Sequence, residues 1–166
     1  MRIKPTLYPI LLLALYLPAG QTTSIAQTKS ASALVPEFPG FSVVVSLSEK
    51  SKAKLLQGHE TIIVAGYLSG DPKKGAPKKI TDEIGQINLG EIKSEVQPGQ
   101  VAKFDEVKMK KDPLVWVDAN GPQLLINVYS GRRSSKDNLL DCGIYEGALK
   151  SAQGTTIPIA CKLIGE

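Results

Sequence analysis

The chain has 166 residues and a formal net charge of +4, with 20 Lys or Arg residues against 16 Asp or Glu. Its two cysteines and one histidine are too few ligands for a zinc site, and there is no Cys-x-x-Cys motif. The length is that of one domain with a sizeable core.

Residues 1–26 have the pattern of a secretory signal peptide. A positively charged start, residues 2–4, precedes an apolar run, residues 7–17, that is too short to span a bilayer. We predict cleavage after Ala26, and the small residues ending at Ala33 offer a second site. An anchor that is never removed is the alternative.

Export would account for part of the basic charge. The signal carries two cations, so the mature chain would hold 18 Lys or Arg against 16 Asp or Glu, a net charge of +2. This gives little support to nucleic-acid binding. We predict a secreted or periplasmic protein with no nucleic-acid partner and no stable membrane span after cleavage. The sequence predicts no oligomeric state.

The mature chain is predicted to begin with a flexible, proline-containing lead-in, residues 27–40, followed by a single domain, residues 41–166. Residues 41–47 place Phe, Val, Val and Leu on alternate positions, which predicts a first strand.

A short helix is expected over residues 48–57. Ser48 is a good N-cap, and Gly58 stands where a helix end favours positive φ. Ala53 and Leu56 are its predicted inner face.

The remaining pattern is that of short strands. Residues 60–68 are largely apolar on both faces, which predicts a central strand. The other expected strands are separated by turn signals: residues 84–92, 101–107, 123–130, 139–145 and 156–163, with residues 114–117 as a short strand or helical turn. We predict an all-β fold, an antiparallel β-sandwich or small barrel of about seven to eight strands with one short helix.

The two cysteines lie in the last two apolar runs. Cys142 and Cys161 each lie at alternate positions with apolar residues, and so on the apolar face of their predicted strand. This placement is equally compatible with a disulfide and with two free cysteines in the core. Disulfides persist outside the cytosol, so export favours the bond. It would close a loop of about 20 residues and contribute roughly 3 kcal/mol.

Catalytic motifs are scarce. The one histidine, His59, precedes Glu60, whose side chain would point to the opposite face of a strand. Residues 118–121, Asp-Ala-Asn-Gly, match only a fragment of a calcium loop, and an Asx turn accounts for them. We predict a protein that is not an enzyme and uses no cofactor or metal. A hydrolase with a site near His59 and Glu60 is an alternative.

Two cationic loops are the candidate binding sites. The first, residues 69–79, contains Pro-Lys-Lys twice. Its cations could attract a polyanion, or could simply keep a nearby sheet edge soluble. They are Lys73, Lys74, Lys78 and Lys79.

The second cationic loop contains Arg132, Arg133 and Lys136 beside Gly131. The guanidinium group of arginine suits carboxylates and phosphates. Because the loop joins two expected strands, one of them held by the disulfide, its cations should be presented with little movement. A purely structural turn is the alternative reading.

Trp116 and Tyr129 could be exposed aromatic residues that bind carbohydrate, although core packing is the commoner role for them. In outline, the export signal, the late cysteine pair and the Ser130-Gly131-Arg132 turn resemble the small bacterial inhibitors that protect the envelope against lysozyme. The strand pattern is also similar to that of transthyretin-like sandwiches. No stretch aligns with the inhibitors' defining motif, so no family is assigned.

We predict an exported, non-catalytic binding module, an envelope accessory or inhibitor-like protein. Its partner would be an acidic protein or envelope polymer, recognised through the two cationic loops. A second hypothesis is a carrier that holds a small apolar ligand in a cavity between the sheets.

Overall fold

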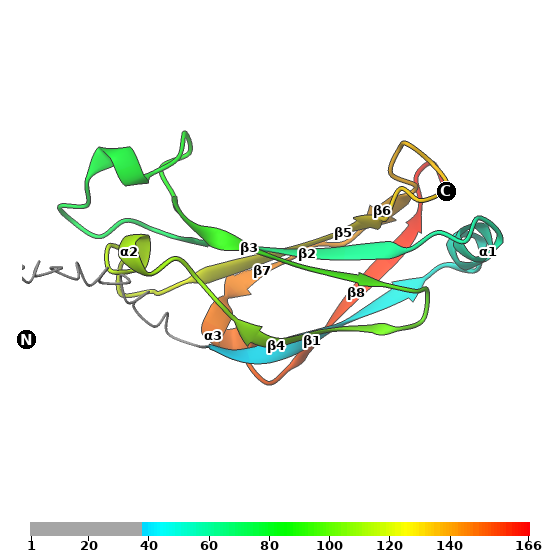
Figure 1. Ribbon diagram of the computed structural model, residues 1–166, viewed down its shortest axis with the longest axis horizontal. Helices are drawn as coiled ribbons and strands as arrows, with labels where there is room; N and C mark the ends of the chain where they lie inside the picture. The colour runs from blue at the N-terminus through cyan, green and yellow to red at the C-terminus, as the bar shows by residue number, and fades with distance from the viewer. Residues whose placement is uncertain (1–37) are drawn as a thin grey trace, which may run out of the picture. The chain divides into compact units, whose positions relative to one another are not determined.

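The computed structural model describes residues 38–166, and the predicted signal peptide and most of the lead-in lie outside this range. The described residues form eight strands in two four-stranded sheets (Figure 1), which confirms the predicted all-β sandwich. The first strand begins at Phe38, three residues before its predicted start at Phe41.

The first sheet has the order β4-β1-β8-β6. Strands β1 and β8 run parallel, and the other two pairs are antiparallel. The strands are β1 (Phe38–Leu47), β4 (Val101–Val107), β6 (Leu140–Cys142) and β8 (Thr156–Leu163).

The second sheet has the order β3-β2-β5-β7, and all its pairs are antiparallel. Its strands are β2 (Ile62–Gly70), β3 (Ile87–Val96), β5 (Gln123–Ser130) and β7 (Tyr145–Ala148). Strand β2 lies between two neighbours, as predicted.

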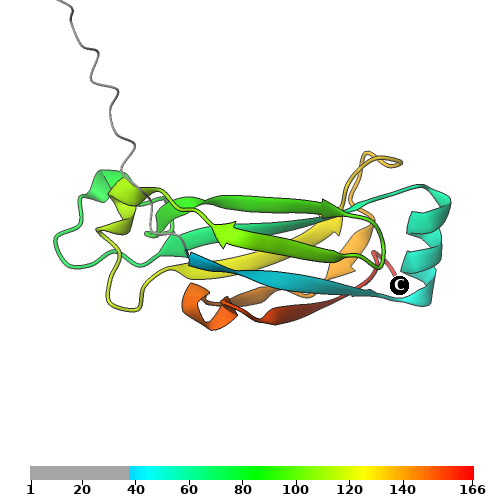
Figure 2. The same cartoon turned by 60° about the horizontal axis from the view of Figure 1, so that its bottom comes forward.

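The long strands run between two ends of the sandwich (Figures 1 and 2). One end carries α1 (Glu49–Gln57), and the other carries the 3-10 helix η1 (Lys78–Ile80) and α2 (Lys111–Leu114). A further short helix, α3 (Leu149–Ala152), precedes β8. Among residues 38–166, none of these helices has the length and apolarity that crossing a membrane requires.

The core lies between the sheets and follows the period of two that strands impose. Strand β5 buries every second residue, and β1 and β8 do the same over their apolar stretches. In the first sheet, the rings of Phe41 and Phe104 pack with centroids 4.9 Å apart. Burying each large apolar side chain contributes about 1.5–3 kcal/mol, so this alternation is the main source of stability.

The disulfide is present as predicted. Cys142 and Cys161 are paired residues of β6 and β8, and their sulfur atoms are bonded at 2.01 Å. Cys161 is buried, whereas Cys142 lies nearer the surface. The bond closes a segment with a sequence separation of 19 and fastens the short edge strand β6 to the long strand β8.

The predicted inner face of α1 is wrong. Ser48 does cap the helix, accepting from the Ser51 N–H at 3.1 Å. The buried residues, however, are Ser51 and Leu55, while Ala53 and Leu56 are exposed. Ser51 can be buried because its hydroxyl bonds to the Ser48 carbonyl at 3.0 Å. The buried pair is therefore spaced i, i+4 and shares one helix face.

The expected role of Gly58 is also wrong. Its φ is −85°, and the residue with positive φ is His59, at 50°. Gly58 serves close approach instead: a Cβ placed there would lie 2.9 Å from the Ser134 hydroxyl oxygen. The end of α1 thus touches the loop between β5 and β6.

Two further boundaries differ from the predictions. Strand β3 begins at Ile87 rather than residue 84, because Asp82 organises a turn that ends at Gln86. Residues 114–117 were predicted as a short strand or a helical turn; the helical turn is the one present, but it lies three residues earlier, in α2, and Trp116 packs against the core.

Candidate functional site

The predicted arginine-containing loop, residues 131–139 and here called the arginine loop, joins β5 to β6 at the end of the sandwich that carries α1 (Figure 1). Its root is fixed on β2 through Gly131, whose N–H donates to the Thr61 carbonyl at 2.8 Å. The adjacent Arg132 has a φ of 58°, so the backbone bends sharply where the cations begin.

A buried carboxylate organises the loop. Glu60, two residues before β2, is 1% exposed. Its Oε1 accepts from the N–H groups of Thr61 and Arg133, at 3.0 and 2.9 Å. Its Oε2 accepts from both the N–H and the hydroxyl of Ser134, each at 2.8 Å. The carboxylate therefore bonds to two successive residues of the loop across more than 70 positions of sequence.

These hydrogen bonds keep Glu60 ionised. Burial alone would raise its pKa, but the N–H groups of Arg133, Ser134 and Thr61 and the Ser134 hydroxyl lower the pKa to about 2. A buried charge is tolerated only when its lone pairs are satisfied, and here both oxygens are.

The Arg133 side chain is held by the protein itself. Its Nε and Nη2 donate to the two oxygens of Glu95 on β3, at 2.8 and 2.7 Å. The Thr61 hydroxyl also donates to Glu95, at 2.6 Å. The Arg133 and Thr61 hydrogen bonds lower the pKa of Glu95, and the Glu95 hydrogen bond raises that of Arg133. The pair is largely exposed, so it positions the loop more than it stabilises the fold.

The far side of the loop is fastened as well. Asn138 accepts from the Ser130 and Leu140 N–H groups at 2.9 and 3.1 Å, bridging the end of β5 and the start of β6. Strand β6 is in turn bonded to β8 through Cys142. The loop is thus held at its start, its middle and its end.

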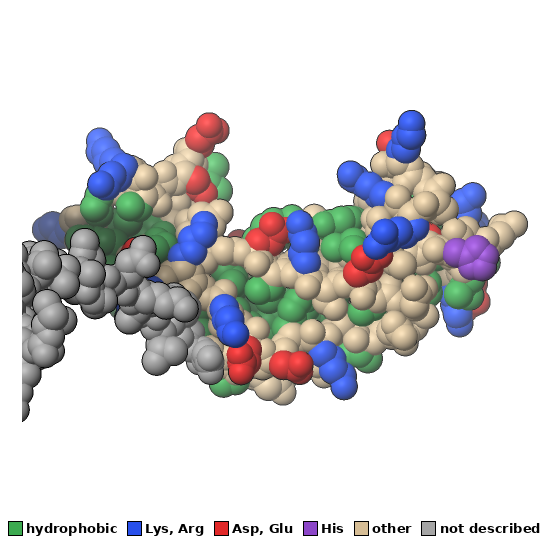
Figure 3. Space-filling model, viewed as in Figure 1, with side chains coloured by type: hydrophobic (Ala, Val, Ile, Leu, Met, Phe, Trp, Pro, Cys, Tyr) green, Lys and Arg blue, Asp and Glu red, His purple; other side chains and the backbone are tan. Residues whose placement is uncertain are grey.

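Arg132 and Lys136 remain available. Both side chains are exposed, and within residues 38–166 neither makes a hydrogen bond or ion pair. Between α1 and the loop is a hollow of about 480 Å³, with Lys54 on one wall and Ser134 and Ser135 on the other. Arg132 and Lys136 do not line it but belong to the same loop. We call Lys54, Arg132 and Lys136, with this hollow, the cationic end. Figure 3 shows Lys and Arg side chains gathered at this end.

The other cationic loop lies at the opposite end, with η1 and α2 (Figures 1 and 3). Lys73 donates to the Val115 carbonyl at 2.6 Å, and its ammonium lies 5.2 Å from the Trp116 ring centroid. In the described part of the chain, Lys74 and the lysines of η1, Lys78 and Lys79, have exposed side chains without partners. Strand β2 separates the two loops by about 26 Å, so the structure does not bring them together.

His59 and Glu60 are adjacent but do not form an acid–base pair. His59 is an exposed turn residue, and the Glu60 oxygens are occupied by hydrogen bonds. The turn at residues 118–121 is an Asx turn, in which Asp118 accepts from the Asn120 N–H at 2.9 Å. Among residues 38–166, no cluster of three or more His, Cys, Asp or Glu residues could hold a metal ion.

Sequence reasoning missed the anchoring residues. Glu60 and Glu95 fix the arginine loop, and Lys54 joins it from α1. One signal was available: Glu60 opens a strand that is apolar on both faces, and a buried carboxylate in such a place requires hydrogen-bond donors. Tyr129, on the outer face of β5, is only partly buried.

Comparisons with protein-family models, with curated proteins and with solved structures found no match. Function is therefore inferred from the geometry of this chain alone.

Proposed function

We propose that the protein is an exported, non-catalytic binding module that recognises an acidic partner, a protein or an envelope polymer, through the cationic end. The observation that carries this proposal is the Glu60 carboxylate, whose bonds to Arg133 and Ser134 hold the loop beside α1. A loop ordered before binding loses less conformational entropy when a partner binds.

The three cations of the cationic end would contact the partner, whereas Arg133 holds the loop in place. Arg133 is engaged with Glu95, whereas Arg132, Lys136 and Lys54 can turn toward a ligand. Arg132 offers a planar pair of donors to a carboxylate or phosphate, and the two lysines add compact charges. The partner is therefore expected to present clustered anionic groups.

The other cationic loop, residues 69–79 and here called the lysine-rich loop, provides weaker support for this function. Its lysines belong to a separate surface, and a partner would need to be long or multivalent to reach both ends. We assign it a secondary role in attracting polyanions over distance, an effect that salt screens.

The test compares two double charge reversals, Arg132→Glu with Lys136→Glu and Lys78→Glu with Lys79→Glu. Both change the net charge equally and alter exposed side chains. The probes are immobilised polyglutamate and dextran sulfate, measured by biolayer interferometry. We expect the first variant to lose at least about tenfold in affinity and the second about threefold or less. Binding should also disappear at about 0.5 M salt.

Equal losses in the two variants would mean that net charge alone drives binding, and would contradict a site at the cationic end. The same follows if the wild-type protein binds neither probe at low salt. Since both variants leave Glu60, Glu95 and the disulfide intact, unfolding is not expected to confuse the comparison.

The alternative functions find less support. The space between the sheets is occupied by the side chains of the core, which leaves a carrier of apolar ligands without an evident chamber. A hydrolase using Glu60 would need a carboxylate free to exchange protons, and a pKa of about 2 with both oxygens bonded is unsuited to that role.

A further inference from the structure

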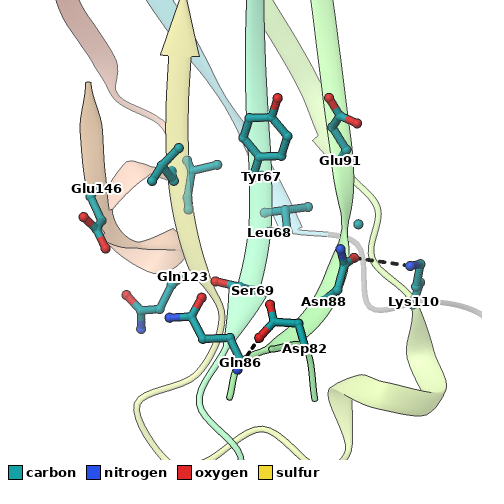
Figure 4. A pocket seen from close by; sticks show the side chains of 13 residues that line it. Tyr67, Leu68, Ser69, Asp82, Gln86, Asn88, Glu91, Lys110, Gln123 and Glu146 are labelled. Atoms are coloured by element: carbon teal, nitrogen blue, oxygen red, sulfur yellow. Dashed lines mark hydrogen bonds between the residues drawn. The ribbon is translucent and has the colours of Figure 1, made fainter. Parts of the chain in front are cut away.

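A groove on the outer face of the second sheet is not part of the cationic end. Its volume is about 580 Å³, within the usual range of small-molecule sites. Figure 4 shows Tyr67 and Glu91 at one end of it and Asp82 and Gln86 at the other, with side chains of β3 and β5 on the two sides.

A β-bulge shapes the floor of this groove. The register of β2 against β3 shifts between Leu68 and Ser69, so that Leu68 pairs with Gly90 and Ser69 with Asn88. Gly90 has a φ of 137°, which side chains disfavour, and a Cβ there would project into open space. Bulges of this kind increase twist and often lie beside binding sites. The hollow is therefore formed by the backbone itself.

Ordered polar contacts form the walls. Asp82 accepts from the N–H groups of Ile84 and Gln86 at 3.1 and 2.8 Å, which fixes the turn that closes one end. On the β3 side of the groove, Lys110 donates to the Asn88 amide oxygen at 3.2 Å (Figure 4). Hydrogen bonds within the protein thus fix the turn and the β3 wall of the groove.

Several polar groups of the lining have no partner. Within residues 38–166, the side chains of Tyr67, Ser69, Gln86 and Glu146 make no hydrogen bond to other protein groups. They include hydroxyls and a carboxamide, which can both donate and accept, and a carboxylate, which only accepts. Tyr67 is also 40% exposed and offers an aromatic surface.

The charge of the lining restricts the ligand. Asp82, Glu91 and Glu146 outnumber the single cation Lys110. Glu91 pairs with Lys93 at 2.7 Å, which leaves Glu146 as the carboxylate free to act on a ligand. An anionic ligand would be repelled, so this groove and the cationic end would select ligands of opposite charge.

We propose that the groove binds a short saccharide that is neutral or carries amino groups. Vicinal hydroxyls both donate and accept hydrogen bonds, which matches a lining of carboxamides, hydroxyls and one free carboxylate. The apolar C–H face of a sugar ring packs on an aromatic ring, and Tyr67 provides one at the end of the groove. An apolar ligand would leave these polar groups unpaired, at a cost in affinity. This inference does not depend on the acidic partner proposed for the other site.

The test is an NMR titration of the protein with four trisaccharides: chitotriose, its deacetylated amine form, maltotriose and trigalacturonate. We expect at least one of the first three to shift the amide signals of Tyr67, Ser69, Asn88 and Gln123, and trigalacturonate to shift none of them. Tyr67→Ala and Glu146→Ala should each weaken that binding by about tenfold. For an amine-bearing ligand, Glu146→Gln should weaken binding more than it does for a neutral one.

The matched control is Tyr129→Ala, which removes a tyrosine from the same face of the sheet outside the groove. It should leave the affinity within about twofold of wild type. The proposal is overturned if none of the three saccharides shifts the groove signals, if trigalacturonate binds there as well as they do, or if Tyr129→Ala is as damaging as Tyr67→Ala. Should Tyr67→Ala fail to fold, Glu146→Ala on the exposed edge strand provides the same test.

Discussion

The two cationic loops look alike in sequence and differ in how the fold holds them. The arginine loop is bonded in its middle by the buried Glu60 and closed by a strand that carries the disulfide. The lysine-rich loop is attached mainly near its start, where the Lys73 N–H donates to the Trp116 carbonyl at 2.9 Å. In the part of the chain that the structure describes, only the arginine loop is bonded to a buried charged side chain.

Each loop also uses one cation for its own structure. Arg133 is bonded to Glu95, and Lys73 to the Val115 carbonyl. Within residues 38–166 the remaining cations of both loops have no partner, but those of the arginine loop are carried by an ordered backbone. The comparison teaches that a cluster of positive charge in a sequence does not reveal which of its members can meet a ligand.

The largest change in stability is expected from removing the disulfide, which bonds β6, the strand after the arginine loop, to β8. Replacing both Cys142 and Cys161 by Ser should lower the free energy of unfolding by about 3 kcal/mol, since the denatured chain gains freedom. Urea denaturation measures this change. A loss below about 1 kcal/mol would mean that pairing of β6 with β8 is sufficient without the bond.

Removing the anchor of the arginine loop should have the next largest effect. Glu60→Ala leaves the Arg133 and Ser134 N–H groups without an acceptor and should cost about 2–3 kcal/mol in urea denaturation. The control is Glu83→Ala, an exposed carboxylate beyond the lysine-rich loop, which should change stability by less than about 0.5 kcal/mol. Equal effects of the two substitutions would contradict the anchoring role.

The contribution of Glu60 to stability should also be visible in the pH dependence of the free energy of unfolding. The pKa of Glu60 is about 2 in the folded protein and 4.5 as its ordinary value, so its contribution is complete above about pH 5 and is lost as pH falls toward 2. Between pH 7 and pH 3 this should remove about 2 kcal/mol from the free energy of unfolding. Glu95 and Glu166 also have lowered pKa values and act in the same direction. The comparison with Glu60→Gln, which cannot titrate there, therefore isolates Glu60, and parallel pH profiles would refute its role.

The smallest effect is expected from the exposed pair on β3. Arg133→Ala and Glu95→Ala in a double-mutant cycle should shift the urea midpoint additively, because a solvent-exposed ion pair contributes little to stability. A double variant that is much more stable than the sum of the single effects predicts would show that this pair, rather than Glu60, is the main attachment of the loop.

Strand parity made much of the fold predictable. Alternating apolar and polar residues identified β1, β5 and β8, and the run that is apolar on both faces identified β2 as central. The disulfide was predicted because both cysteines lie on the apolar face of their strands and the chain carries an export signal. The helix face could not be predicted in this way. Two adjacent leucines, Leu55 and Leu56, are equally apolar, and the prediction paired Leu56 with Ala53. The local bonds between Ser48 and Ser51 instead allow a serine to be buried on the same face as Leu55.

The site was predictable only in part. Arg132 and Lys136 were predicted as binding residues because of their charge, which can be read directly from the sequence. That Arg133 is engaged, and that Glu60 supports the loop, depends on contacts between residues far apart in the chain. The groove near Gly90 was not foreseen either, because a register shift between two strands leaves little trace beyond a glycine.

The account is tested most directly by amide hydrogen exchange at Arg133 and Ser134. Both N–H groups donate to buried Glu60, so they should exchange far more slowly than that of Lys74, which donates no hydrogen bond within the described residues. They should lose this protection in Glu60→Ala, which removes both acceptor oxygens. Exchange of Arg133 and Ser134 as fast as that of Lys74 in the wild-type protein would contradict the claim that the buried carboxylate orders the arginine loop.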